Sequence, residues 1–174
     1  LTPGDTKAEL DTLLNAFLEF EQYYNEDAPL EKVLPKLTKV YGDRYKGYTL
    51  KQLCQEMHNY YRGNKTFTLQ QELFAKPNMQ NYPMTPEHAD YLFIKNESEL
   101  VNLDDVKGRI AAEGALPYPP GVFIVAPGEK WSDIDQKYFE VLVGAIERFP
   151  GFVPEIQGVY WDQKADGKIR VQAE

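Results

Sequence analysis

Cys54 and His58 form a pair of side chains whose spacing could support catalysis. Residues four positions apart share one face of a helix, so the imidazole could activate the thiol as a nucleophile. The pair lies on an apolar stripe with Leu53 and Met57, and no oxyanion donor is obvious nearby. We interpret Cys54 as a small core side chain, and a thiol enzyme, which would need a lowered thiol pKa, ranks last among the candidate functions.

Other catalytic and metal-binding patterns are absent from the sequence. His58 and His88 belong to no HExxH pattern and have no second histidine at ligand spacing, so no metal ligand is predicted. There is no GxGxxG, GxxxxGK[ST] or GxSxG motif. Neighbouring carboxylates are interpreted as solvated faces, and no acid–base pair is predicted among them: Glu19 and Glu21, Asp104 and Asp105, Asp133 and Asp135.

Residues 116–129 contain the most distinctive local pattern. Three prolines surround Tyr118: Pro117, Pro119 and Pro120. Proline fixes φ and extends the preceding residue, so we expect Tyr118 on a stiff, polyproline-like arm that leads into a strand. Gly128 permits a tight turn, which would place Glu129 at a strand-to-helix corner. Two interpretations of residues 116–129 remain open: a purely structural turn, or the wall of a functional cleft.

The composition excludes several classes of protein. The chain has 174 residues, 43% of them hydrophobic, which is enough for one buried core. No run approaches the roughly 18 to 20 apolar residues of a bilayer-spanning helix. The net charge of −8 would repel phosphate and anionic lipid, so neither nucleic acid nor a membrane is expected as a partner. A single cysteine and the lack of a secretory signal favour the cytoplasm.

The first half of the chain has the apolar spacing of helices. Thr6 and Thr49 each begin a capping-box pair, with Glu9 and Gln52, and Thr85 precedes a first-turn proline. Pro35 should kink or split its element. Helices are therefore predicted over about 6–24, 30–41, 50–63, 69–75 and 87–94.

From Glu99 onward the pattern changes to short strand-like runs. These runs are 100–103, 109–112 and 122–125. One long helix follows Ser132 and ends near Phe149, and 158–161 and 168–171 flank a turn at Asp166 and Gly167 that favours a β-hairpin.

The predicted fold class is α+β. A helical part, about 1–96, precedes a small, mostly antiparallel sheet with one long helix, about 97–174. No linker or repeat divides the chain, so we expect a single domain over 1–174. The start at Leu1 and the strand-like run near the last residue lead us to expect a piece of a longer protein.

Several motifs occur together and in order along nearly the whole chain. They are Arg-Ile-Ala-Ala at 109–112, Pro-Tyr-Pro-Pro-Gly at 117–121 and Pro-Gly-Glu at 127–129, with further matches at 1–4, 28–35, 53–58 and 149–152. This set resembles the C-terminal region of the bacterial ornithine/lysine/arginine decarboxylases. Pro-Glu-Ile-Gln-Gly-Val-Tyr at 154–160 is more similar to the ornithine branch than to the lysine or arginine branches.

The resemblance implies a domain of an enzyme that uses pyridoxal phosphate to convert L-ornithine to putrescine and CO₂ in polyamine biosynthesis. In that family the Schiff-base lysine follows a histidine in the cofactor domain. Here Asn59 follows His58 and Ala89 follows His88, so the motif is missing. We therefore expect no catalytic residue, no cofactor-binding residue and no activity from this chain alone.

The resemblance also implies partners. The chain would pack on the catalytic core of the same decarboxylase and its oligomer mates, and would shape the entrance for a basic amino acid. Tyr118 and Glu129 are the candidate entrance residues, and Arg109 is expected in a structural ion pair with a core carboxylate. The alternative is a noncatalytic assembly or regulatory module that binds through its tyrosine-rich helical half. A domain taken from an enzyme should expose a large apolar patch, whereas an independent module should not.

Overall fold

The computed structural model describes residues 2, 4–75, 78, 82–118, 121–161 and 170–174. Contacts within the chain define two compact units, Leu1–Tyr60 and Tyr61–Glu174. The division falls within helix α5 (Leu50–Gly63). The strands begin at Glu99, close to the position where the sequence predicts a change from helices to strands. The single domain expected from the sequence stays a prediction.

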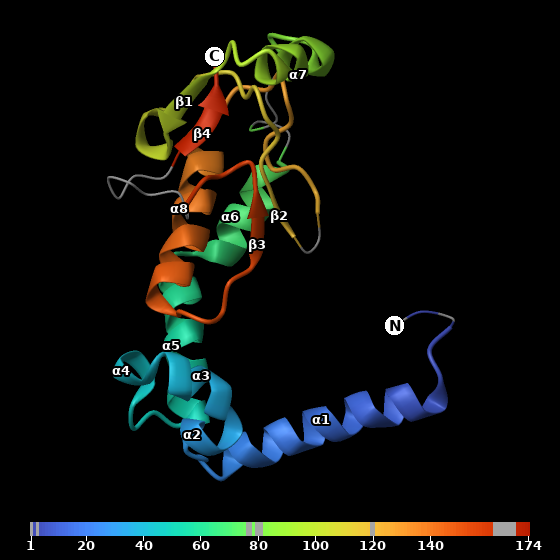
Figure 1. The fold of residues 1–174 in the computed structure, drawn as a ribbon, viewed down its shortest axis with the longest axis vertical. Helices are drawn as coiled ribbons and strands as arrows, with labels where there is room; N and C mark the ends of the chain where they lie inside the picture. The colour runs from blue at the N-terminus through green and yellow to red at the C-terminus, as the bar shows by residue number, and fades with distance from the viewer. Residues whose placement is uncertain (1, 3, 76–77, 79–81, 119–120, 162–169) are drawn as a thin grey trace. The chain divides into compact units, whose positions relative to one another are not determined.

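The first unit is helical (Figure 1). After α1 (Lys7–Asn25), three short helices precede the start of α5: α2 (Leu30–Val33), α3 (Pro35–Val40) and α4 (Gly42–Tyr45). Pro35 begins a new helix, which confirms the predicted split. Leu30, Tyr45 and Leu53 are fully buried between these elements.

Side chains fix where α1 and α5 begin. Thr6 Oγ1 accepts a hydrogen bond from the Glu9 amide at 3.3 Å, and the Glu9 carboxylate accepts from the Thr6 amide at 2.7 Å. Thr49 and Gln52 make the same reciprocal pair, at 3.2 and 3.0 Å. Both predicted capping boxes are confirmed, because each satisfies amides that the first helical turn leaves unpaired.

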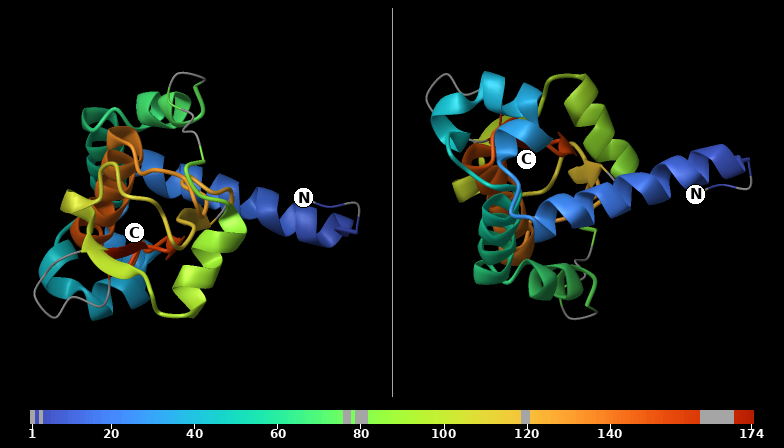
Figure 2. Two further views of the ribbon diagram at one scale, coloured as in Figure 1. Left: turned by 90° about the horizontal axis from the view of Figure 1, so that it is seen from above. Right: turned by 90° about the horizontal axis from the view of Figure 1, so that it is seen from below.

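The apolar side chains of α1 have little to pack against within their unit. The helix has no buried residue. Figures 1 and 2 show its N-terminal part extending beyond α2–α4. The five side chains that we call the α1 apolar stripe are 40–62% exposed: Leu10, Leu13, Leu14, Phe17 and Leu18. The predicted helix therefore forms with its apolar face uncovered.

The second unit is built around α8 (Asp133–Arg148), which contributes eight buried residues. It packs against α6 (Thr66–Leu73) and the 3₁₀ turn η2 (Leu103–Asp105), and α7 (Pro86–Ile94) completes the helices of this unit. Trp131 packs against Phe139 with ring centroids 5.7 Å apart, at the centre of the core. Ser132 caps α8 as predicted, and Thr85 caps α7.

Two small antiparallel sheets complete this unit. β1 (Glu99–Asn102) pairs with β4 (Arg170–Ala173), and β2 (Leu116–Tyr118) pairs with β3 (Glu155–Gln157). The predicted α+β class, with a helical part before small antiparallel sheets and one long helix, is confirmed. Within the described ranges, no helix is both long and apolar enough to cross a bilayer.

Some strand predictions were wrong. Residues 109–112 make backbone hydrogen bonds on both sides, to 129–131 and to 172–174, but only single bridges result. Residues 122–125 make a single bridge, between Val125 and Ala115. Tyr118, expected on a polyproline-like arm, lies in β2 instead.

The predicted hairpin is present as a single antiparallel bridge between its two arms. Tyr160 and Arg170 form an isolated bridge, so the two ends do meet. The ladder of β4 is made with β1, however, where Val101 and Val171 are paired and both buried. The turn at Asp166 and Gly167 lies outside the described residues.

Gly158 is predicted to tolerate no side chain. Its φ of +74° lies in the left-handed region, and a Cβ there would collide with the carbonyl oxygen of Gly114. Gly108 also has a positive φ, +79°, but a Cβ there would meet open space. We expect Gly108→Ala to lower the free energy of unfolding by about 1 kcal/mol and Gly158→Ala to lower it by clearly more. Urea unfolding of both variants tests this, and equal losses would contradict the steric argument.

Candidate functional site

Glu129 follows a tight turn that requires glycine. Gly128 has φ of +87°, and a Cβ there would collide with the carbonyl oxygen of Met84. The Glu129 carboxylate folds back and accepts a hydrogen bond from the Ala126 amide at 2.7 Å. Its backbone carbonyl accepts from Ala111 at 2.8 Å. The turn therefore holds the carboxylate just before α8, where it meets an amide of its own turn.

Glu129 lines a pocket of about 340 Å³ in the second unit. The pocket lies between the end of α6, residues 122–126 and the start of α8. The polar lining residues are Asn78, Tyr82, Glu129 and Asp135. The apolar wall consists of Leu73, Phe74, Val122, Phe123, Ile124 and Ala126. We call this cavity the Glu129 pocket.

Asp135 is the buried carboxylate of this pocket. It is 7% exposed, and its Oδ2 accepts hydrogen bonds from the Ser132 amide at 2.9 Å and the Ser132 hydroxyl at 2.6 Å. Burial raises the pKa of Asp135; the bonds from Ser132 oppose this, and the charge of Glu129 adds to it. The pocket thus holds two carboxylates close enough to repel each other.

Tyr82 lies beside the same carboxylate. The negative charge of Glu129 raises the pKa of Tyr82, with further contributions from burial and from a hydrogen bond between the two side chains. Neither Tyr82 nor Asp135 was a candidate on sequence grounds. Asp135 was interpreted as solvated, which is wrong. The signal that could have found it is its spacing from Ser132, because the third residue of a capping box faces the helix start.

Tyr118, the other predicted entrance residue, lies elsewhere in this unit. It is 54% exposed in β2, and its ring lies against Gly121. Tyr118 is not among the residues that line the Glu129 pocket. The structure thus does not place the two candidates in one pocket, and their role at an entrance stays a prediction.

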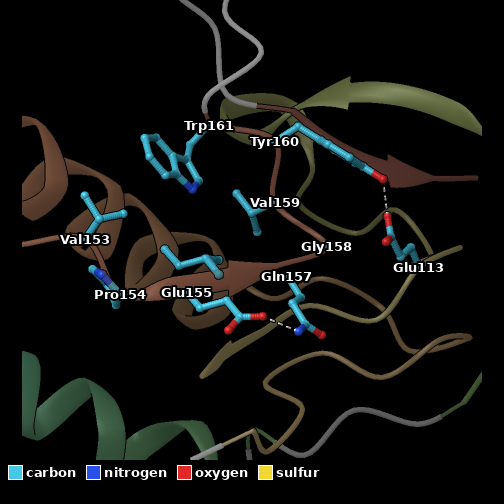
Figure 3. Close-up of a pocket in the computed structure, with 10 residues that line it drawn as sticks. Glu113, Val153, Pro154, Glu155, Gln157, Gly158, Val159, Tyr160 and Trp161 are labelled. Atoms are coloured by element: carbon cyan, nitrogen blue, oxygen red, sulfur yellow. Dashed lines mark hydrogen bonds between the residues drawn. The ribbon is translucent and has the colours of Figure 1, made fainter. Parts of the chain in front are cut away.

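A second, more open groove of about 560 Å³ lies along β3 and the residues after it. Figure 3 shows that Tyr160 points its hydroxyl at Glu113, to which it donates a hydrogen bond of 2.6 Å, whereas the Trp161 ring points the other way. Burial raises the pKa of Tyr160 to about 12, with further contributions from the hydrogen bond and charge of Glu113. Gln157 donates to Glu155 at 2.7 Å on the same strand.

Arg109 makes the ion pair that the sequence predicted, but not with a core group. Its guanidinium lies 2.6 Å from the Glu99 carboxylate, and the Glu99 side chain is largely exposed. Since exposed ion pairs contribute about 0 to 1 kcal/mol, this one adds little to stability.

The first unit does not show an activated thiol. Cys54 is half-buried on α5, and burial raises its pKa, which disfavours the thiolate that nucleophilic catalysis needs. Across the described residues, no group of three or more His, Cys, Asp or Glu could hold a metal ion.

Three pockets of the described residues lack the lysine that pyridoxal phosphate needs. A pyridoxal site needs a lysine for the Schiff base. Among the described residues, no lysine lines the Glu129 pocket, the groove along β3 or a further pocket at Thr85, Glu87, His88 and Tyr91. We therefore derive no chemical step through this cofactor on the present chain.

Comparison with known proteins gives a consistent result. Residues 67–174 match the family model described as "Orn/Lys/Arg decarboxylase, C-terminal domain". The chain is 49% identical to an inducible ornithine decarboxylase of Lactobacillus sp. (strain 30a), covering 95% of this chain and 23% of the relative. It is 48% identical to an ornithine decarboxylase of Haemophilus influenzae, covering 98% of this chain and 24% of the relative.

A solved structure has the same fold. Lysine decarboxylase A from Pseudomonas aeruginosa superposes with a TM-score of 0.85 at 31% identity, covering 98% of this chain and 23% of that one. The chain therefore spans about a quarter of the length of the proteins it matches.

The Tyr160–Glu113 contact predicts a loss of stability at high pH. The ordinary pKa of tyrosine is 10, whereas folding raises that of Tyr160 to about 12. Between these values the unfolded chain releases the proton and the folded chain keeps it, so the contribution of Tyr160 to stability is complete below pH 10 and falls as pH rises towards 12. Urea unfolding at several pH values should show the wild type losing stability relative to Tyr160→Phe over this window.

The matched control for this experiment is Tyr118→Phe, at an exposed tyrosine of the same unit. It removes one hydroxyl without removing the bond to Glu113. A wild type that keeps a constant stability difference from Tyr160→Phe up to pH 12 would contradict the prediction.

Proposed function

Because the chain belongs to the family of Orn/Lys/Arg decarboxylase C-terminal domains, we propose that it is the C-terminal domain of an ornithine decarboxylase. The whole enzyme converts L-ornithine to putrescine and CO₂: the bond between Cα and the carboxylate breaks, and Cα takes up a proton. Pyridoxal phosphate, when bound in the catalytic core, supplies the electron sink for this step. The product is a diamine of polyamine biosynthesis, and the enzyme acts in the cytoplasm.

The choice of ornithine is supported by the identities to the relatives. Two relatives named as ornithine decarboxylases are 48–49% identical to this chain, compared with 31% for the lysine decarboxylase of known structure. This difference is the observation that carries the proposal. A module that binds a partner and acts independently of any enzyme is not favoured, since these relatives are much longer chains named as decarboxylases.

The α1 apolar stripe supports packing on a catalytic core. Burial of one Leu or Phe side chain contributes about 1.5–3 kcal/mol, and this stripe leaves five such side chains at least 40% exposed. About three quarters of each relative's length lies outside the region matched by this chain. We take that missing portion, rather than an unrelated protein, as the surface that covers the stripe.

We assign the entrance role to residues of the second unit. The whole chain, with a net charge of −8, would attract a cationic amino acid. We propose that Glu129 and Tyr118 lie at the active-site entrance of the assembled enzyme. The proposed partners of this chain are the catalytic core of the same decarboxylase and its oligomer mates.

Mixing tests the proposed function directly. Putrescine release from ornithine with added pyridoxal phosphate should be absent for this chain alone and should appear when the catalytic portion is added. Release of cadaverine from lysine should be much weaker. Activity of the isolated chain, or lysine as the better substrate, would overturn the proposal.

Substitution in the α1 apolar stripe tests the docking surface. Phe17→Glu places a charge at a side chain that is 62% exposed, so it should leave the fold intact and weaken association with the catalytic portion by about tenfold or more. Asn15→Glu adds the same charge at an exposed position outside the stripe and should have little effect. Equal effects on association in a pull-down titration would argue against docking through the stripe.

A further inference from the structure

β1 forms an edge of its sheet. Figure 1 shows this strand beside β4, and within the described residues β1 pairs with β4 alone. β4, by contrast, is bonded on both sides, because Gln172 and Glu174 also make backbone hydrogen bonds with residues 110–112. The edge of a sheet presents unpaired amides and carbonyls, which are a template for a further strand.

The backbone of Leu100 points towards this edge. Leu100 lies opposite Gln172, whose carbonyl accepts a hydrogen bond from the Ala112 amide at 3.1 Å on the other side of β4. Backbone groups alternate between the two sides of an antiparallel strand, so the neighbouring pairs of the β1–β4 ladder, and not this one, exchange hydrogen bonds. The amide and the carbonyl of Leu100 therefore point away from β4, and neither makes a hydrogen bond with a residue that the structure describes.

The side chains of β1 leave this edge unprotected. Leu100 is 50% exposed, whereas Val101, on the opposite face of the strand, is 9% exposed and belongs to the core. Proteins commonly protect an exposed strand edge with lysine or proline, but residues 98–102 contain neither. The edge thus combines a free backbone donor and acceptor with an apolar side chain.

We propose that β1 pairs with β1 of a second copy of this chain, antiparallel and about a twofold axis at Leu100. In this arrangement Leu100 donates its amide hydrogen to the carbonyl of the partner's Leu100 and accepts from the partner's amide. The two leucine side chains meet on the exposed face of the joined sheet, where each loses contact with water.

The edge is complementary to itself in this register. Glu99, the charged residue of β1, lies opposite the partner's Val101 and not opposite another acid. Its carboxylate is 2.6 Å from the Arg109 guanidinium, which compensates its charge. Since like charges directly opposite each other destabilise a sheet, the absence of such a pair favours a second copy as the occupant.

The inference does not rest on the proposed function. It requires two copies of this chain and neither a catalytic portion nor pyridoxal phosphate. Failure to dimerise would leave the decarboxylase assignment intact, and failure of the mixing experiment would leave the β1 edge intact.

Sedimentation of the 174-residue chain tests the pairing. All samples carry Phe17→Glu, so that the α1 apolar stripe does not drive association. A concentration-dependent dimer is expected. Leu100→Lys and Leu100→Glu each place like charges opposite each other, and each should weaken the dimer by about tenfold or more. An equimolar mixture of the two variants should restore it, because lysine then faces glutamate.

Ile94 provides the matched control. It is a more exposed aliphatic residue, 71%, in α7 and outside β1. Ile94→Lys and Ile94→Glu should leave the dimer unchanged, alone and mixed. Circular dichroism establishes that each variant is folded.

Hydrogen exchange tests the same contact without a change in β1. The Leu100 amide should exchange more slowly as the concentration of the Phe17→Glu chain rises, because pairing with a second copy protects it. This measurement decides the question should the Leu100 variants fail to fold.

Several results would overturn the proposal. These are a folded chain that stays monomeric at about 1 mM, a dimer that is insensitive to folded Leu100→Lys and Leu100→Glu, or no recovery on mixing them. Displacement of the dimer by the added catalytic portion would assign the edge to that portion instead.

Discussion

The hydrogen bonds between Ser132 and Asp135 are the constraint on which the second unit depends. They satisfy amides at the start of α8, so the helix begins at a fixed residue and turns its apolar face towards the core. Eight residues of α8 are buried as a result, and Trp131, immediately before the cap, fills the space beside Phe139. The same bonds fix the position of the largely buried Asp135 carboxylate, and Asp135 lines the Glu129 pocket. One capping interaction therefore links the start of the central helix of the core to a carboxylate of the pocket.

The first unit presents the opposite situation, a well-capped helix with little to pack against. A capping box defines the start of α1, but helices in water gain most of their stability by packing an apolar face. The α1 apolar stripe, from Leu10 to Leu18, is exposed and so does not supply this packing energy. This agrees with a chain that covers about a quarter of the length of its relatives. The alternative of an independent module would require these side chains to be covered within the chain.

Carboxylates close to tyrosines recur in two pockets of the second unit. Glu113 accepts from Tyr160 in the groove along β3, and Glu129 lies beside Tyr82 in the smaller pocket. The charge of Glu129 raises the pKa of Tyr82, and burial together with the hydrogen bond and charge of Glu113 raises the pKa of Tyr160, so each phenol keeps its proton to a higher pH than a free tyrosine. Acidic pockets with aromatic and apolar walls suit a protein whose proposed substrate and product are both aliphatic amines.

The sequence by itself determined the elements whose signals are local. Capping pairs at Thr6, Thr49 and Ser132 predicted where helices begin, and the motifs at 109–129 identified the family. Strand pairing and side-chain burial depend on residues far apart in the sequence, and only the tertiary structure decided them. β4 pairs with β1, where Val101 and Val171 are both buried, and the short-range signal of a hairpin could not reveal this additional partner. Likewise, the spacing from Ser132 could mark Asp135 as a capping residue, but its burial and its place in one pocket with Glu129 depend on the packing of α6 and residues 122–126. Burial and the meeting of two like charges are properties of three-dimensional proximity, which local sequence patterns do not encode.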